Sequence, residues 1–122
     1  IETITLDEFF EGKEDLIDVI KIDVEGAEML VLSGMDKILR KNKKIKMIIE
    51  FFPLLIREMG SSPREFIQKV LKDYLFSIFV IPDDYNALKG KIMRINSANE
   101  IMHFYKSEKD HMNLFLEHED KT

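Results

Sequence analysis

Three acidic residues and a glycine follow directly on an apolar stretch near the start of the chain. In the segment "DVIKIDVEGAEMLVLSGM", residues 18–35, these are Asp23, Glu25, Gly26 and Glu28. Carboxylates at such a position either stabilise the start of the next helix or face a ligand. Facing a ligand, they serve as general bases or hold a divalent cation. Which of these roles applies depends on the helices and strands around them.

Asp23 is expected to lie close to the core, because its neighbours Ile22 and Val24 are apolar. An unpaired carboxylate there is costly, so Asp23 needs a partner, either a backbone N–H of the following turn or a ligand. If strand geometry continues through residue 25, the side chains of Asp23 and Glu25 share a face about 6.6 Å apart. Gly26 permits a positive φ or a close approach of backbone to a neighbour, and its place beside the acids favours a site over a plain turn.

Other acids stand at the ends of apolar runs as well. Glu28 falls in the first turn of the expected helix, where a negative charge stabilises the helix dipole by about 0.3–1 kcal/mol, and capping is preferred to ligand binding for it. Glu50 comes near the end of the next apolar run, and Asp83 and Asp84 follow a third one. Ligands of open parallel α/β sheets lie beyond the carboxyl ends of the strands, so these positions are candidates for one shared site.

Strand-like segments at 18–24, 45–52 and 75–82 have apolar residues on both faces, which is typical of a sheet covered on both sides. Helical segments separate them, which implies right-handed crossovers and an α/β fold with a mostly parallel sheet. Residues 90–95 are either a short strand or an extended loop, and a last strand at 112–118 is expected to run antiparallel.

Helix starts are marked by Ser or Thr followed three residues later by Glu, a capping box, at Thr5, Ser62 and Ser97. The first helix is expected to carry Phe9 and Phe10 inward, and the last to extend to about Tyr105. Another helix follows Gly26, with a break or bend near Gly34, and a helix of about ten residues follows Pro63.

The composition indicates a single domain over residues 1–122, with 45% hydrophobic and 34% charged residues, and a disordered tail over 116–122. A net charge of -5 argues against nucleic-acid binding, and no apolar run reaches the roughly 18–20 residues that span a bilayer. The absence of cysteine suits a reducing compartment, so a cytoplasmic location is expected. The chain begins with Ile1 rather than Met, and we interpret it as a piece of a longer protein.

Histidines at 103, 111 and 118 lack metal-ligand spacing and are interpreted as surface or packing residues, and no metal site is predicted. None of the five glycines forms G-x-G-x-x-G, and no phosphate-binding loop is present. The chain is therefore not expected to hold a phosphate or dinucleotide cradle of its own.

The segments "TLDEFF", "IDVIKIDVEGAEMLVLSGM" and "IIEFFP", taken in this order, resemble the C-terminal half of FkbM-type methyltransferases. The resemblance is clear over about residues 3–53, and "IKIDVEGAE" is its most specific part. It implies transfer of a methyl group from S-adenosylmethionine, mostly to oxygen, on a class I methyltransferase sheet, which is Rossmann-like. In that sheet residues 18–24 and 45–51 would be the fourth and fifth strands. The segments near 75–81 and 113–117 would be the last two, one of them antiparallel.

On this resemblance Asp23, Val24 and Gly26 would contact the cofactor, and Asp23 or Glu25 would be the catalytic base for a hydroxyl of a small molecule or sugar. A divalent cation that lowers the pKa of the hydroxyl is the less favoured branch. Glu50 and Glu28 would contact the acceptor. The cofactor loop of the family belongs to the first two strands, which this chain does not include. The chain is therefore expected to form one wall of the cleft and to be inactive alone.

Two other interpretations stay open. "DVEG" followed later by "PDD" loosely resembles the motifs of magnesium-dependent phosphohydrolases, and a non-catalytic α/β module would use the acids only as helix caps. If the strand at 18–24 lacks a neighbour on one side, its unpaired edge also favours a homodimer.

Overall fold

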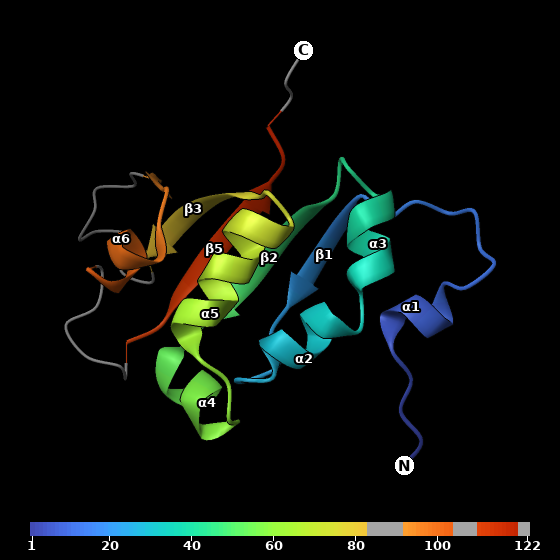
Figure 1. Ribbon diagram of the computed structural model, residues 1–122, viewed down its shortest axis with the longest axis horizontal. Coiled ribbons are helices and arrows are strands. Elements are labelled where there is room, and N and C mark those ends of the chain that lie inside the picture. The colour runs from blue at the N-terminus through green and yellow to red at the C-terminus, as the bar shows by residue number, and fades with distance from the viewer. Residues whose placement is uncertain (83–91, 104–109, 120–122) are drawn as a thin grey trace.

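The computed structural model of the protein describes residues 1–82, 92–103 and 110–119. Its centre is a five-stranded sheet with the strand order β1-β2-β5-β3-β4 (Figure 1). The strands are β1 (Val19–Ile22), β2 (Lys46–Phe51), β3 (Ser77–Pro82), β4 (Met93–Ile95) and β5 (Met112–Glu117). All the expected strands are present, and the segment left open between strand and loop is β4.

The sheet is mixed rather than mostly parallel, so that expectation was wrong. β1 and β2 pair in parallel, whereas β5 is antiparallel to both β2 and β3, and β4 is antiparallel to β3. Because β5 opposes both of its neighbours, β1, β2 and β3 run in the same direction, but β5 separates β3 from the other two. The antiparallel last strand is confirmed. Apolar patterning predicts a strand but not its neighbours, which is why the insertion was missed.

The helices are α1 (Leu6–Phe9), α2 (Glu28–Ser33), α3 (Asp36–Lys41), α4 (Pro53–Glu58), α5 (Pro63–Gln68), the π-helical turn η1 (Lys69–Asp73) that continues α5, and α6 (Ala98–Met102). The three helix starts are confirmed: Thr5, Ser62 and Ser97 each accept the backbone N–H three residues on, at 3.1–3.2 Å. Gly34 separates α2 from α3 as expected. Within the described ranges, no helix has the length and apolar character to cross a membrane.

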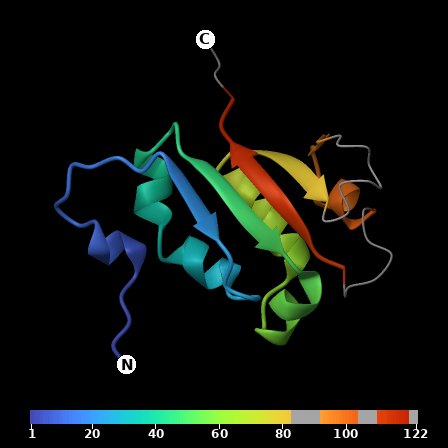
Figure 2. The same ribbon diagram turned by 180° about the vertical axis from the view of Figure 1, so that it is seen from behind.

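Helices α2, α3, α4 and α5 lie on one face of the sheet, and the view from behind shows the strands uncovered (Figure 2). The covered face carries the core, with buried side chains such as Ile22, Ile49, Leu114 and Val80 aligned across neighbouring strands. For the described residues, the expectation of a sheet covered on both sides was therefore wrong. The apolar residues of the other face remain half-buried, as at Phe79 and Phe115, whose ring centroids lie 6.2 Å apart.

Two expectations at the ends of the chain also need correction. Phe9 is 50% exposed instead of facing inward, because α1 has a single turn and, of the two phenylalanines, only Phe10 packs against the core. The tail does not start at residue 116: Leu116 is fully buried in β5, and the ring of His118 stacks on Phe76 with centroids 4.0 Å apart. Leu116 pairs with strands on both sides, and this holds the chain end in place.

Three other expected features, Asp83, Asp84 and the end of a helix at Tyr105, lie outside the described residues.

Candidate active site at the carboxyl ends of β1 and β2

The loop between β1 and α2 turns through two successive left-handed residues. β1 ends at Ile22, and Glu25 and Gly26 have φ angles of 49° and 104°. A left-handed conformation is unfavourable for a residue with a side chain, so the surrounding structure must hold Glu25 in it. Strand geometry therefore stops before residue 25, and the expected placement of Asp23 and Glu25 on one face of a strand does not apply.

Gly26 is buried beneath α4. A Cβ atom on this glycine would lie 2.6 Å from the carbonyl carbon of Leu55 and 3.0 Å from Cγ of Met59. Both properties expected of Gly26, a positive φ and a close backbone neighbour, are thus present, and the neighbour is the backbone of α4 rather than open space. Because α4 directly follows β2, this contact holds the loop after β1 against the segment after β2.

Asp23 is exposed, which corrects the expectation that it lies close to the core. β1 ends at Ile22, one residue before Asp23. Ile22 is buried, whereas Val24 is already 40% exposed. Within the described residues, no backbone N–H of the loop closes off the Asp23 carboxylate. Because the Asp23 carboxylate is not buried, it does not need a partner within the protein, and it is open to a ligand.

Glu28 is the buried carboxylate of this site, with 1% of its surface exposed. Burial raises its pKa above the ordinary value of 4.5, and repulsion from Asp23 adds to this, whereas hydrogen bonds with the backbone of Glu28, Val24 and Gly26 act in the opposite direction. Its Oε2 atom has no hydrogen-bond partner among the described residues. Glu28 was expected to act as a helix cap. It does lie in the first turn of α2, but it binds the backbone of the preceding loop, and one buried oxygen is left over.

Glu50 lies close to His111, which the sequence predicted to be a surface or packing residue. Glu50 pairs with Asn113 across β2 and β5, and the Nδ1 atom of His111, just before β5, lies 3.7 Å from Oε1 of Glu50. The His111 ring also packs against Phe52, with centroids 5.4 Å apart. No local pattern could have indicated this pair, because only the insertion of β5 beside β2 brings the two residues together.

The ends of β1 and β2 lie side by side, because the strands are parallel and Ile22 is in register with Ile49. Asp23 and Glu28 therefore follow one strand and Glu50 stands near the end of its neighbour, as the sequence predicted. In the described ranges no group of three His, Asp or Glu side chains is arranged to hold a metal ion. The arrangement offers carboxylates that can accept a proton or attract a cationic group.

The parts of the site formed by β1, β2 and the segments that follow them fall within the residues matched by one family model. The sequence model described as "Methyltransferase FkbM domain" matches residues 1–78, which is more than half of the 122-residue chain. No curated protein and no solved structure shows significant similarity to it. The family match covers the loop after β1, the end of β2 and α4. The chain therefore belongs to the FkbM methyltransferase domain family.

Proposed function

We propose that this chain forms part of an S-adenosylmethionine-dependent methyltransferase that methylates a hydroxyl group of a small molecule or sugar. The family match supports methyl transfer, and the exposed carboxylate of Asp23 at the carboxyl end of β1 is the observation that carries the assignment of the site. This is the position at which open α/β sheets place their ligands. Neither of the other two interpretations, a phosphohydrolase or a non-catalytic module, has support of this kind.

The protein's part in such a reaction is to orient the acceptor and to remove its proton. S-adenosylmethionine, when bound, supplies a methyl group on a positively charged sulfur. We assign the role of base to Asp23 or Glu25, both of which are exposed. A positioned general base contributes typically about 10²–10⁴-fold to a rate. We assign acceptor contact to Glu50, which lies beside His111.

Glu28 fits a positioning role better than direct contact with the acceptor. Its side chain is buried and interacts with the backbone of Val24 and Gly26, so it holds the loop that presents Asp23. A loop held in one conformation places its carboxylate without an entropic cost at the moment of reaction.

The residues of this site have the chemistry to contact part of S-adenosylmethionine. S-adenosylmethionine carries an ammonium group, a sulfonium and ribose hydroxyls, which the carboxylate of Asp23 and the backbone of Val24 could bind. Gly26 contributes the shape of the loop, because Leu55 occupies the space above its Cα. We propose that the chain supplies one wall of the cleft and is inactive alone. Calorimetric titration of the 122-residue chain with S-adenosylmethionine is then expected to show no tight binding, and micromolar binding would contradict a one-walled cleft.

Substitution of Asp23 in the complete enzyme tests the assigned base. Asp23→Asn keeps the size of the side chain but not its basicity, so turnover is expected to fall about 100-fold or more while the melting temperature stays unchanged. Asp15→Asn is a matched control, because Asp15 is an exposed aspartate that precedes β1. Unchanged turnover in Asp23→Asn would remove this residue from the mechanism.

A further inference from the structure

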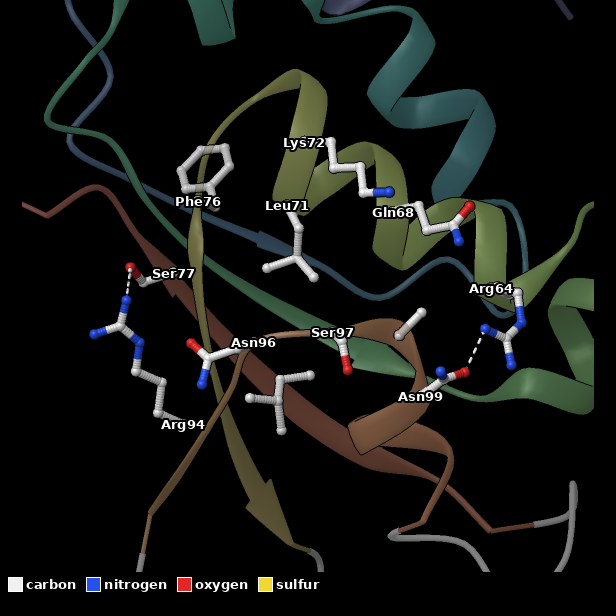
Figure 3. Close-up of a pocket in the computed structure, with 12 residues that line it drawn as sticks. Arg64, Gln68, Leu71, Lys72, Phe76, Ser77, Arg94, Asn96, Ser97 and Asn99 are labelled. Carbon is white, nitrogen blue, oxygen red and sulfur yellow. Dashed lines mark hydrogen bonds between the residues drawn. The ribbon is translucent and has the colours of Figure 1, made fainter.

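A concave region lies between the α5–η1 helix and the β4–α6 segment (Figure 3). Its volume is about 380 Å³, and none of its lining residues belongs to the β1–α2 loop, β2 or α4. We call it the basic groove. It is separate from the proposed methyl-transfer site, so a different ligand has to be considered.

Positive charge gathers on this groove although the chain as a whole is negative, with a net charge of -5. Arg64, Lys72 and Arg94 line the groove, and among the described residues that line it there is no carboxylate. Arg94 is neutralised, because it forms an ion pair with Glu119 and also donates to Ser77 Oγ at 3.3 Å. The charge that remains available therefore belongs to Arg64 and Lys72.

Arg64 and Lys72 form one side of the groove together with Gln68. The three residues are spaced by four, so they lie along one side of the helical segment formed by α5 and η1. Nη1 of Arg64 donates to Oδ1 of Asn99 at 2.6 Å, which anchors the guanidinium at the α6 end through a neutral partner (Figure 3). Within the described part of the chain, Lys72 pairs with no carboxylate, and its ammonium group points toward Gln68. This side of the groove thus presents donors and positive charge with no acidic counterpart.

The floor of the groove is apolar. Phe76, Ile95 and Ala98 are buried beneath it, and Leu71 is half-buried at its side. Small-ligand sites commonly have volumes of about 300–1,000 Å³ and combine an apolar lining with a few polar groups. The size and the division into an apolar floor and a basic side match a small amphipathic anion better than a peptide or a nucleic acid.

We infer that the basic groove binds a small organic anion whose apolar body rests on Leu71, above the buried side chain of Ile95. Its anionic group, a phosphate or a carboxylate, is bound by the stripe of Arg64, Gln68 and Lys72. Arginine and lysine are the residues that bind both of these groups, through charge-assisted hydrogen bonds.

Titration of the isotopically labelled chain, followed by NMR at low salt, tests this inference. Phenyl phosphate and benzoate are the anionic probes, phenol is the neutral one, and inorganic phosphate lacks the apolar body. We expect phenyl phosphate or benzoate to shift the backbone amide signals of Ser77, Ile95 and Asn96, and to bind at least about 10-fold more tightly than phenol or inorganic phosphate. The tighter of the two anions identifies the anionic group.

Two substitutions and a control locate the binding. Lys72→Gln and Arg64→Gln each remove one charge from an exposed helical position, and each is expected to weaken the better probe roughly 10-fold. Lys43→Gln, an exposed lysine in the turn before β2, is expected to leave binding unchanged. Equal binding of phenol, no signal shift at millimolar phenyl phosphate and benzoate, or equal weakening in Lys43→Gln would each overturn the inference. None of these outcomes bears on Asp23, so the methyl-transfer proposal stands or falls independently.

Discussion

The backbone of Leu55 lies directly against the Cα atom of Gly26, so closely that no side chain fits between them. This contact joins the loop after β1 to the helix after β2, and it fixes the spacing between the two strand ends that carry Asp23 and Glu50. The candidate site therefore depends on a contact in which neither residue contributes a reactive group.

Gly26→Ala is expected to destabilise the fold by about 2–4 kcal/mol, because it combines a left-handed φ with overlap against α4. Gly60→Ala separates the two causes: Gly60 has a φ of 85° and no atom within 4 Å of a Cβ, so only the conformational cost of about 1–2 kcal/mol applies. Urea unfolding measures both variants. Equal losses in the two would show that α4 gives way and that the contact does not hold the loop.

Glu28→Gln is expected to change how stability depends on pH. Burial raises the pKa of Glu28 in the folded protein above 4.5, so its neutral form is favoured on folding, and stability is lost as pH rises through the folded pKa. The amide side chain introduced by the substitution does not ionise, so this loss should be absent from the variant. Melting temperatures between about pH 4 and 8 measure the difference.

Glu25→Gln is the control for Glu28, because Glu25 is an exposed neighbour in the same loop. It should retain the pH dependence of the unsubstituted protein. A Glu28→Gln profile that follows the unsubstituted protein over the whole range would contradict the buried, pKa-raised state of Glu28.

His118 is expected to make the protein sensitive to mild acid. Burial against Phe76 lowers the pKa of its imidazole below 6.5, and a hydrogen bond with the backbone of Leu75 opposes this only in part. The unfolded chain takes up a proton near pH 6.5 while the folded chain resists it, so stability falls as pH drops below that value. His118→Phe keeps an aromatic stack and should lose less melting temperature between about pH 7 and 5. An identical loss in both proteins would assign the acid sensitivity to other groups.

Tyr74→Phe is expected to lower stability by about 0.5–1.5 kcal/mol at pH 7. The Tyr74 hydroxyl donates to Oδ1 of Asp36 at 2.6 Å, which joins η1 to α3 and is the main cause of the lowered pKa of Asp36. A lowered carboxyl pKa stabilises the fold above pH 3.8, and this contribution is lost as pH falls. The difference in stability between Tyr74→Phe and the unsubstituted protein should therefore shrink toward about pH 3. A double-mutant cycle with Asp36→Asn measures the coupling, and additive effects would contradict it.

The edge of β1 is expected to support association of two copies. Asp18 directs its carbonyl to Lys46 of β2, so the alternate residues Val19 and Lys21 direct their backbone groups away from the sheet. Light scattering at high concentration should show a dimer, and Lys21→Pro, which removes an outward N–H, should reduce it. A monomer at high concentration in the unsubstituted protein would contradict association through this edge.

The sequence alone determined most of the elements and the family of this protein. Apolar runs predicted β1, β2, β3 and β5 and left β4 open between strand and loop, capping boxes predicted three helix starts, and "IKIDVEGAE" carried the family resemblance that the match over residues 1–78 confirms. These signals are local, because helix caps and buried strands depend on residues a few positions apart. The placement of acids at the ends of β1 and β2 was likewise predicted from residues that are neighbours in the sequence.

Only the tertiary structure decided which carboxylate is buried and which strands are neighbours. Asp23, expected near the core, is exposed and Glu28 is buried, because β1 ends at Ile22 and the chain then turns through two left-handed residues. His111 reached Glu50 because β5 entered the sheet beside β2 from more than 60 positions along the chain. Burial and strand order depend on contacts between distant segments, and no short stretch of sequence contains that information.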